Sequence, residues 1–297
     1  MNPKRYTCIL LSICPIFIGT ASCTDEKQES IEVRVPYEFT SVIAGGWHTC
    51  GMDRSEQIRC WGDNEHGQLD VPSATFSSLT SGLTHMCGIT DAQTSMCWGD
   101  NRHGQSNVPN EAFVQIDAGI RHTCGRTTTG LVLCWGDDTY GQASPPAGTF
   151  VHVTAGELHS CGITTEGDVV CWGDDSYGQS SPIQGAYQYV FAGLQYSCGL
   201  QNNGNVVCWG IVSGEVPDTT FLTLSVGLEH SCGITTENDA VCWGEDMYGQ
   251  SSAREGVFTH VSAHGWHSCG LNQDSLIKCW GNDSLGQSTP PTDVQYQ

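Results

Sequence analysis

The sequence predicts an all-β fold, a seven-bladed β-propeller of short antiparallel blades with one disulfide inside a hairpin of each blade. A His-x-Cys-Gly motif, with Tyr for His in one copy, alternates seven times with a Cys-Trp-Gly motif. The first cysteines of successive copies lie 37 residues apart, except for one step of 34. The runs between the motifs are short and rich in β-branched and aromatic residues. Units this small must stack to bury a core, and seven antiparallel blades suit a closed ring.

Copy four shows the repeat unit most clearly. Three strand-like runs, 150–153, 159–163 and 169–173, are separated by glycine and polar residues. No segment after residue 30 has the spacing of apolar residues that is typical of an amphipathic helix. The stretch 164–167 predicts a hairpin turn, because Gly167 can adopt a positive φ. Each copy is therefore expected to form a small antiparallel meander.

The two cysteines of each copy stand ten residues apart. A turn at 165–167 sets Cys161 opposite Cys171, and facing Cα atoms about 4.5 Å apart are within disulfide range. A zinc site made of His-x-Cys and the second cysteine is the alternative. Copy five keeps both cysteines although Tyr196 replaces its histidine, which favours disulfides. The expected pairs are Cys50 with Cys60, Cys87 with Cys97, Cys124 with Cys134, Cys161 with Cys171, Cys198 with Cys208, Cys232 with Cys242, and Cys269 with Cys279.

The constant tryptophan and histidine of the repeat are expected to be framework residues. The tryptophan of Cys-Trp-Gly supplies a large apolar side chain, which we place between neighbouring blades. The recurring histidines occupy one fixed blade position, which favours a buried hydrogen-bonding role over catalysis. No Ser-His-Asp, P-loop or dinucleotide signature accompanies them, so the sequence does not predict an enzyme. These histidines are His48, His85, His122, His159, His230 and His267.

The ends of the chain predict how the ring closes. The sequence stops shortly after copy seven, where other copies continue into a new strand. We expect the strand at 39–42 to sit beside the last repeat and latch the ring, with the alternating run 31–35 extending this latch. The predicted domains are a lipoprotein-type signal peptide (1–22), a polar tether with the latch strand (23–38) and the propeller (39–297).

The N-terminus predicts export. Lys4 and Arg5 precede an apolar run that is too short to span a membrane. Small residues then lead to Cys23, as in a bacterial lipobox, although Thr20 stands where an aliphatic residue is usual. After the signal is removed and the repeat cysteines pair, Cys23 is left over. We expect Cys23 to carry a lipid that anchors the protein in the cell envelope, in the outer membrane or facing the periplasm. Plain secretion with a free thiol is the alternative.

Acidic residues dominate the charge. Lys and Arg number 11 against 32 Asp and Glu, for a net charge of −21. This balance disfavours nucleic acid and favours a protein partner, with the chain itself a monomer. The sequence predicts no resident metal or cofactor. The loops after Cys-Trp-Gly carry acids that we expect to cap turns, with calcium binding as the alternative. These acids are Asp63, Asp100, Asp137, Asp138, Asp174, Asp175, Glu245, Asp246 and Asp283.

The residue just before each histidine varies, although a framework position would repeat. Trp47 and Trp266 occupy it in copies one and seven, which ring closure makes neighbours. Arg121 and Leu158 are expected to continue the same surface, which is the predicted binding site. Two tryptophans on one rim are typical of an interaction hot spot. Packing against the latch strand at the seam is an equally weighted alternative. Copy five lacks three residues and the acidic loop, which leaves a docking notch or neutral divergence open.

The pattern Gly-x-x-His followed by Cys-Trp-Gly-Asp-x-x-Tyr-Gly-Gln resembles the repeat of the regulator of chromosome condensation family, over about residues 39–290. The short blade is similar to that of bacterial relatives, which include β-lactamase inhibitor protein II. The resemblance implies a seven-bladed propeller and no single function.

The predicted function is that of an exported, lipid-anchored scaffold that binds a protein through the Gly-x-x-His face. Inhibition of an exported enzyme is the specific version that the bacterial resemblance implies. The alternatives are a carbohydrate- or calcium-binding module, or an enzyme that uses the acidic face. Nucleotide exchange on a small GTPase rests on the family resemblance alone.

Overall fold

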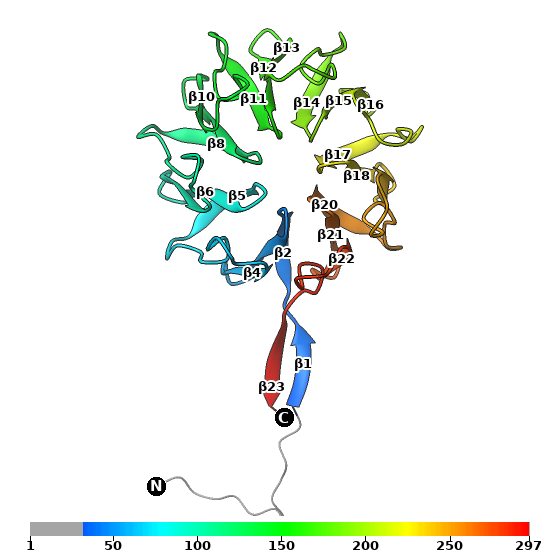
Figure 1. Ribbon diagram of the computed structural model, residues 1–297. Helices are drawn as coiled ribbons and strands as arrows, with labels where there is room; N and C mark the ends of the chain where they lie inside the picture. The colour runs from blue at the N-terminus through cyan, green and yellow to red at the C-terminus, as the bar shows by residue number, and fades with distance from the viewer. Residues whose placement is uncertain (1–31, 297) are drawn as a thin grey trace, which may run out of the picture.

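The computed structural model describes residues 32–296, so the predicted signal peptide and Cys23 lie outside the described residues. Seven three-stranded antiparallel sheets form a ring, and a separate two-stranded ribbon projects from it (Figure 1). The prediction of an all-β seven-bladed propeller is therefore confirmed. Within residues 32–296, no helix has the length and apolar character needed to cross a membrane.

Each blade contains an inner, a middle and an outer strand, in chain order. The inner strands are β2 (Phe39–Ala44), β5 (Phe76–Ser81), β8 (Phe113–Ala118), β11 (Phe150–Ala155), β14 (Tyr187–Ala192), β17 (Phe221–Val226) and β20 (Phe258–His264). The middle strands are β3 (His48–Asp53), β6 (His85–Thr90), β9 (His122–Thr127), β12 (His159–Thr164), β15 (Tyr196–Gln201), β18 (His230–Thr235) and β21 (His267–Asn272). The outer strands are β4 (Ile58–Gly62), β7 (Ser95–Gly99), β10 (Val132–Gly136), β13 (Val169–Gly173), β16 (Val206–Gly210), β19 (Ala240–Gly244) and β22 (Ile277–Gly281).

The hairpin between middle and outer strands has the predicted register. Cys161 faces Cys171, and their Cα atoms lie 4.0 Å apart across a disulfide. Gly167 adopts a φ of +92° in the turn, as expected. All seven predicted disulfides are present, each between the middle and outer strands of one blade. The ten-residue spacing of the cysteines thus follows from a short turn between two paired strands.

The core is divided among the interfaces between blades. Trp172 of blade four packs against Cys124 and Val132 of blade three, and also against Phe150 of its own blade. The other blades repeat this arrangement, so that each interface has its own hydrophobic cluster. The tryptophans are therefore inter-blade core residues, as the sequence predicts.

A polar relay joins each blade to the next. Ser160 of blade four donates a hydrogen bond to the Gln142 carbonyl, which lies in the preceding rim loop (3.0 Å). Trp172 Nε1 donates to the same carbonyl (2.9 Å), and His122 Nε2 of blade three contacts the Ser160 hydroxyl (2.7 Å). Because that hydroxyl already donates to the carbonyl, His122 must carry its proton on Nε2 and donate it. The relay satisfies polar groups that would otherwise be buried without partners.

Two interfaces depart from the relay. In blade two, Met86 stands where the hydroxyl belongs, and Ser81 from the inner strand takes its place against His48 Nε2 (3.0 Å). In blade five, the shortened loop lacks the glutamine, and Tyr196 reaches Ser231 with its hydroxyl (3.0 Å). Trp243 Nε1 is buried there without an acceptor among the described residues. Because the shortened loop no longer offers a glutamine carbonyl to Ser231, the Tyr196 hydroxyl gives Ser231 a hydrogen-bond partner instead.

The ring closes with the same relay that joins the other blades. Thr49 of blade one donates to the Gln287 carbonyl (2.9 Å) and contacts His267 Nε2 (2.7 Å). β2 lies beside the last repeat, where the Phe39 backbone N–H donates to the Ser275 carbonyl (2.7 Å). Its own strand partner, however, is β3 of blade one.

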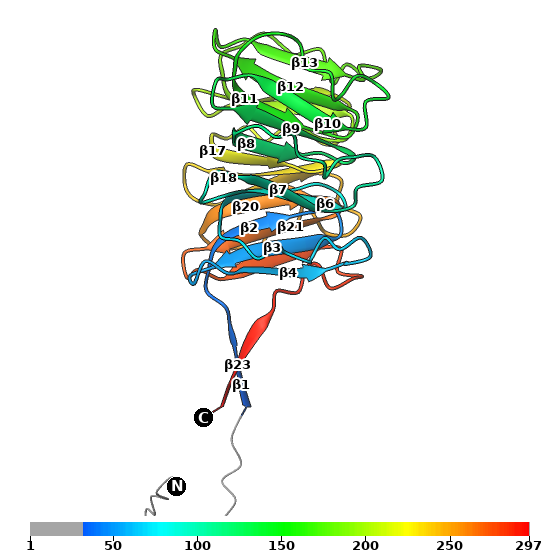
Figure 2. The same cartoon turned by 90° about the vertical axis from the view of Figure 1, so that its left-hand side faces the viewer.

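The run expected to extend the latch forms a strand from residue 32 onward, outside the blades. β1 (Glu32–Pro36) pairs antiparallel with β23 (Thr292–Tyr296). The two strands form the ribbon that projects from the ring beside blades one and seven (Figures 1 and 2). The seam thus combines the relay, the packing of β2 and this terminal ribbon.

Removing the Thr49 hydroxyl tests whether the relay holds the seam. We expect Thr49→Val to lower the free energy of unfolding by about 1–3 kcal/mol, because it leaves buried polar partners unsatisfied. Thr123→Val, at the equivalent position inside the chain, should lower it by a similar amount. Guanidinium denaturation with the disulfides oxidised measures both. A wild-type value for Thr49→Val alone would show that the β1–β23 ribbon holds the seam instead.

The six relay histidines are buried and neutral. Burial lowers the pKa of His122 from 6.5 to about 3, and the neighbouring His159 lowers it further. Its Nδ1 is buried with no partner among the described residues, so a second proton there would have no acceptor. The pKa values of the other five are lowered to about 3 or 4, in each case mainly by burial.

The depressed pKa values predict a loss of stability in acid. Below pH 6.5 the unfolded chain binds protons at these histidines, whereas the folded chain does so only near pH 3. Stability is therefore complete above pH 6.5 and falls towards pH 3, by up to about 1.4 kcal/mol per pH unit for each histidine. His122→Gln should make the decline between pH 6.5 and 4 less steep by one such share. Denaturant unfolding at several pH values measures this, and equal slopes for variant and wild type would contradict it.

Candidate functional site

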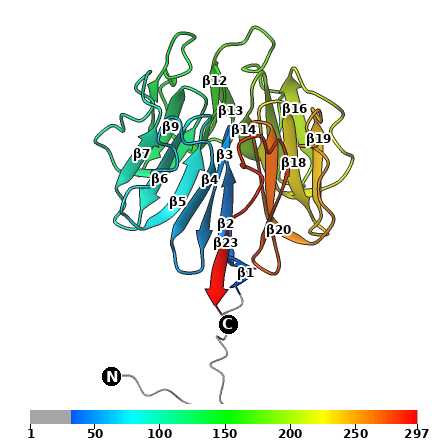
Figure 3. The same ribbon diagram turned by 60° about the horizontal axis from the view of Figure 1, so that its bottom comes forward.

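Two sets of loops share one face of the ring, as the hairpin topology predicts. The strands of each blade run between the two faces (Figure 3). In blade four, the carbonyl of Leu158, the residue before the histidine, accepts a hydrogen bond from the Asp174 N–H of the rim loop (2.8 Å). Blade one has the same bond between Trp47 and Asp63 (2.9 Å). We call this the Gly-x-x-His face.

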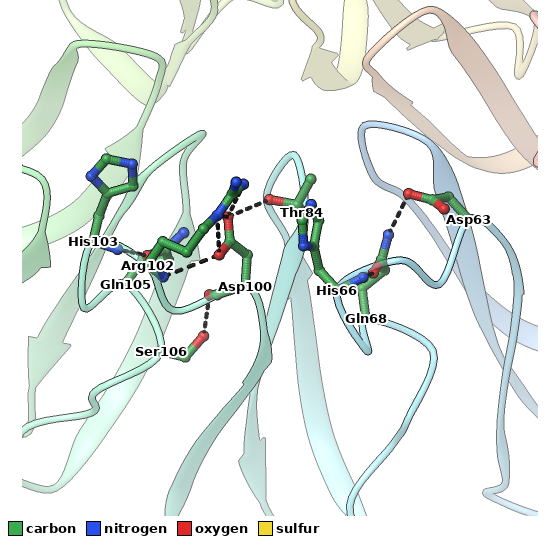
Figure 4. Close-up of polar contacts among 9 residues, drawn as sticks. All are labelled: Asp63, His66, Gln68, Thr84, Asp100, Arg102, His103, Gln105 and Ser106. Carbon is green, nitrogen blue, oxygen red and sulfur yellow. Dashed lines mark hydrogen bonds and ion pairs between the residues drawn. The ribbon is translucent and has the colours of Figure 1, made fainter.

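The acidic side chains on this face cap the turns of their own loops. Asp63 accepts from the Glu65 backbone N–H (3.1 Å) and from Gln68 Nε2 (2.9 Å), as Figure 4 shows in part. In the next blade, Asp100 binds the Arg102 guanidinium (2.8 Å), which holds the pKa of that carboxyl well below its usual range (Figure 4). All nine rim acids accept a backbone N–H of their own loop. Within residues 32–296, no group of three or more His, Cys, Asp or Glu is placed to hold a metal ion.

Ring closure brings Trp47 and Trp266 into contact. Their ring centroids lie 4.4 Å apart, with the ring planes inclined by 33°. Both side chains are half-buried, and neither belongs to the hydrophobic clusters between the blades. The pair thus forms a partly exposed aromatic platform at the seam of blades one and seven.

Arg121 and Leu158 lie on the same face but not beside the tryptophans. They belong to blades three and four, which stand across the ring from blades one and seven (Figure 1). Arg121 is exposed and Leu158 is half-buried. The expected continuous surface is therefore two separate groups of residues on opposite sides of the ring centre.

A cavity of about 370 Å³ occupies the central channel. The ends of the seven inner strands and the turns that follow them form its wall. Ile120, Glu157 and Leu228 line it where the inner strands lead into the Gly-x-x-His loops. Asp117 and Phe191 line it deeper along the inner strands.

Three residues of this wall depart from the repeat, and the sequence analysis missed them. His264 stands where the other six blades have glycine, at the end of the inner strand. Glu157 is the one charged residue at a position held elsewhere by Gly, Leu or Ile. Asp117 is the one charged residue at a position held elsewhere by Ser, Thr, Ile or Phe. Comparing every repeat position, and not only the residue before the histidine, would have found all three.

Burial determines the protonation of these groups. It raises the pKa of Asp117, against the opposing effect of hydrogen bonds from Ala155 N–H (2.9 Å) and the Thr154 hydroxyl (2.8 Å). It also raises the pKa of Glu157, against the opposing effect of the positive charge of Arg121. Burial lowers the pKa of His264 to about 4, so this imidazole is neutral at pH 7. Acidic groups thus line a cavity that has no charged base in its wall.

The solved structures similar to this chain are propellers. The ectodomain of the Physcomitrella patens receptor kinase CR4 is 26% identical, with a TM-score of 0.70 over 83% of this chain and 74% of that one. The ectodomain of the Arabidopsis thaliana receptor kinase ACR4 is also 26% identical, with a TM-score of 0.71 over 86% and 98%. Yeast RCC1 (Prp20), solved with Kap60, is 15% identical, with a TM-score of 0.50 over 86% and 73%. No curated protein matches the chain significantly.

These findings fit a scaffold better than a catalyst. The seven disulfides, together with the ectodomain origin of two structural neighbours, indicate an oxidising, exported environment. The family model of the regulator of chromosome condensation (RCC1) repeat matches residues 39–68, 76–105, 113–142, 150–179 and 222–250, half of the chain. With its seven blades and their recurring motifs, the chain belongs to the RCC1 repeat family.

Proposed function

We propose that this protein is an exported scaffold that binds a protein partner through its Gly-x-x-His face. The observation that carries the proposal is the stacked pair Trp47 and Trp266. Tryptophan anchors contribute strongly to protein interfaces when a partner buries them completely. This pair is already ordered by its own stacking, so a partner would gain contact area without a large loss of side-chain entropy.

The outer edge of the same face adds apolar contacts. The rim loops present large exposed side chains. Glutamine side chains accept a hydrogen bond from the backbone N–H of four of these residues, and Glu245 accepts one from the N–H of Met247. Exposed apolar residues around one rim are typical of protein contact surfaces. These side chains are Tyr140, Tyr177, Met247, Tyr248 and Leu285, with exposed fractions of 47–76%.

An enzyme-inhibiting role is the specific version that we favour within this proposal. A face held rigid by disulfides suits an inhibitor, because the protein loses little conformational entropy when it binds the enzyme. The repeat style that resembles β-lactamase inhibitor protein II supports the same choice.

Replacing both tryptophans tests the binding face. We expect Trp47→Ala/Trp266→Ala to abolish capture of the partner from an envelope extract, because the variant lacks the aromatic platform. Leu131→Ala, an exposed hairpin-tip residue on the other face, should capture it as the wild type does. Immobilised protein and mass spectrometry provide the readout, with thermal unfolding as the folding control. Unchanged capture by the double variant together with a lowered Tm would assign the pair to seam packing.

Cys23 tests the proposed anchor. We expect the mature protein in the membrane fraction to begin at Cys23 and to carry acyl chains, which intact-mass measurement detects. Cys23→Ser should release the propeller from that fraction with its seven disulfides intact. An unmodified thiol at residue 23 of the wild type would instead support plain secretion.

A further inference from the structure

The wall of the central cavity carries acidic side chains that the propeller framework does not require. At one position of the inner strand, a side-chain oxygen accepts a hydrogen bond from the backbone of the next blade. Ser262 accepts from Ala44 N–H (2.9 Å), and Ser225 accepts from Ala263 N–H (2.9 Å). A hydroxyl is thus sufficient for this bond between blades.

Asp117 makes the same bond with a carboxylate. Its Oδ2 accepts from Ala155 N–H (2.9 Å) and from the Thr154 hydroxyl (2.8 Å), while Oδ1 accepts from the Thr80 hydroxyl (3.0 Å). Thr80 and Thr154 fill the same position in the two flanking blades and carry no charge. The charge of Asp117 is therefore an addition to the framework.

The wall carries acids on one side, and elsewhere it mixes hydroxyl and imidazole groups with hydrocarbon. Glu157 belongs to blade four and Asp117 to the adjoining blade three, and both residues line the cavity. Ile120, Leu228 and Phe191 add hydrocarbon surface. No lysine or arginine belongs to the wall of this cavity. A cation with an apolar stem matches this combination, whereas the described residues offer no cluster suited to a metal ion.

We propose that the central cavity binds an organic cation, an ammonium or guanidinium group on a hydrocarbon stem. The charged group lies at Asp117 and Glu157, and the stem contacts the aliphatic wall. A bound cation also offsets the burial of these carboxyls by favouring their ionised form. The same chemistry occurs in free amines and in lysine or arginine side chains of a partner docked on the Gly-x-x-His face. The site does not depend on the tryptophan pair.

The experiment uses the mature chain and two probes that share a five-carbon stem but carry a charged or a neutral head group. Pentylammonium should bind, whereas 1-pentanol, with the same stem, should not. Asp117→Thr keeps an acceptor for Ala155 N–H, as Thr154 does for the next blade, and should weaken pentylammonium binding at least tenfold. Asp91→Asn removes one charge from an exposed hairpin tip and should leave binding unchanged. Isothermal titration or ligand-observed NMR measures the affinities.

A second variant keeps the test decisive if Asp117→Thr does not fold. Glu157→Leu copies the residue of blades five and six and should also weaken pentylammonium binding. Nα-acetyl-lysine N-methylamide separates the two sources: binding like that of pentylammonium supports a partner's side chain, and binding of pentylammonium alone supports a free amine. Equal affinities of wild type and both variants, or of amine and alcohol, would overturn the proposal. Because Trp47 and Trp266 stay intact, these results do not depend on whether a partner is captured.

Discussion

The hydrogen bonds between blades are the interaction on which the rest of the structure depends. The carbonyl of a rim-loop glutamine, such as Gln142, receives both the indole N–H and the hydroxyl of the following blade. A loop at the surface is thereby fixed by the core of its neighbour. Since each blade supplies the acceptor for the next, the fold needs a closed ring to satisfy its first and last members. Thr49 and Gln287 meet this need across the seam.

Much of this framework could be predicted because each motif serves a local geometry that recurs. The pairing of Cys161 with Cys171 follows from strand register and a short turn, which lie within ten residues of one another. The relay could not be predicted, because its members come from two blades and lie 18 to 38 residues apart. Ser81, which stands in for the missing hydroxyl at Met86, shows the difficulty: only the folded arrangement reveals that the two positions converge on His48.

Of the candidate site, the sequence predicted the proximity of the two tryptophans, which follows from closure of the ring. Copies one and seven must be neighbours, so the proximity of Trp47 and Trp266 could be inferred. The separation of Arg121 and Leu158 from them follows from the same ring, because copies three and four lie across it from the seam. The cavity residues were missed for another reason. Asp117 has threonine at the equivalent position of both flanking blades, and its charge is conspicuous only when that position is compared in all seven blades.

Departures from the repeat fall into two kinds, and the difference has a physical meaning. Tyr196 compensates for the shortened loop of copy five by reaching Ser231, so this change largely restores the framework. Asp117 and Glu157 restore nothing, because a hydroxyl or an aliphatic side chain serves at those positions in other blades. A partly buried carboxylate such as Asp117, with no cation among its hydrogen-bond partners, raises the free energy of the folded chain. Its presence in the wall of the central cavity is therefore more readily explained by a ligand of opposite charge than by the needs of the fold.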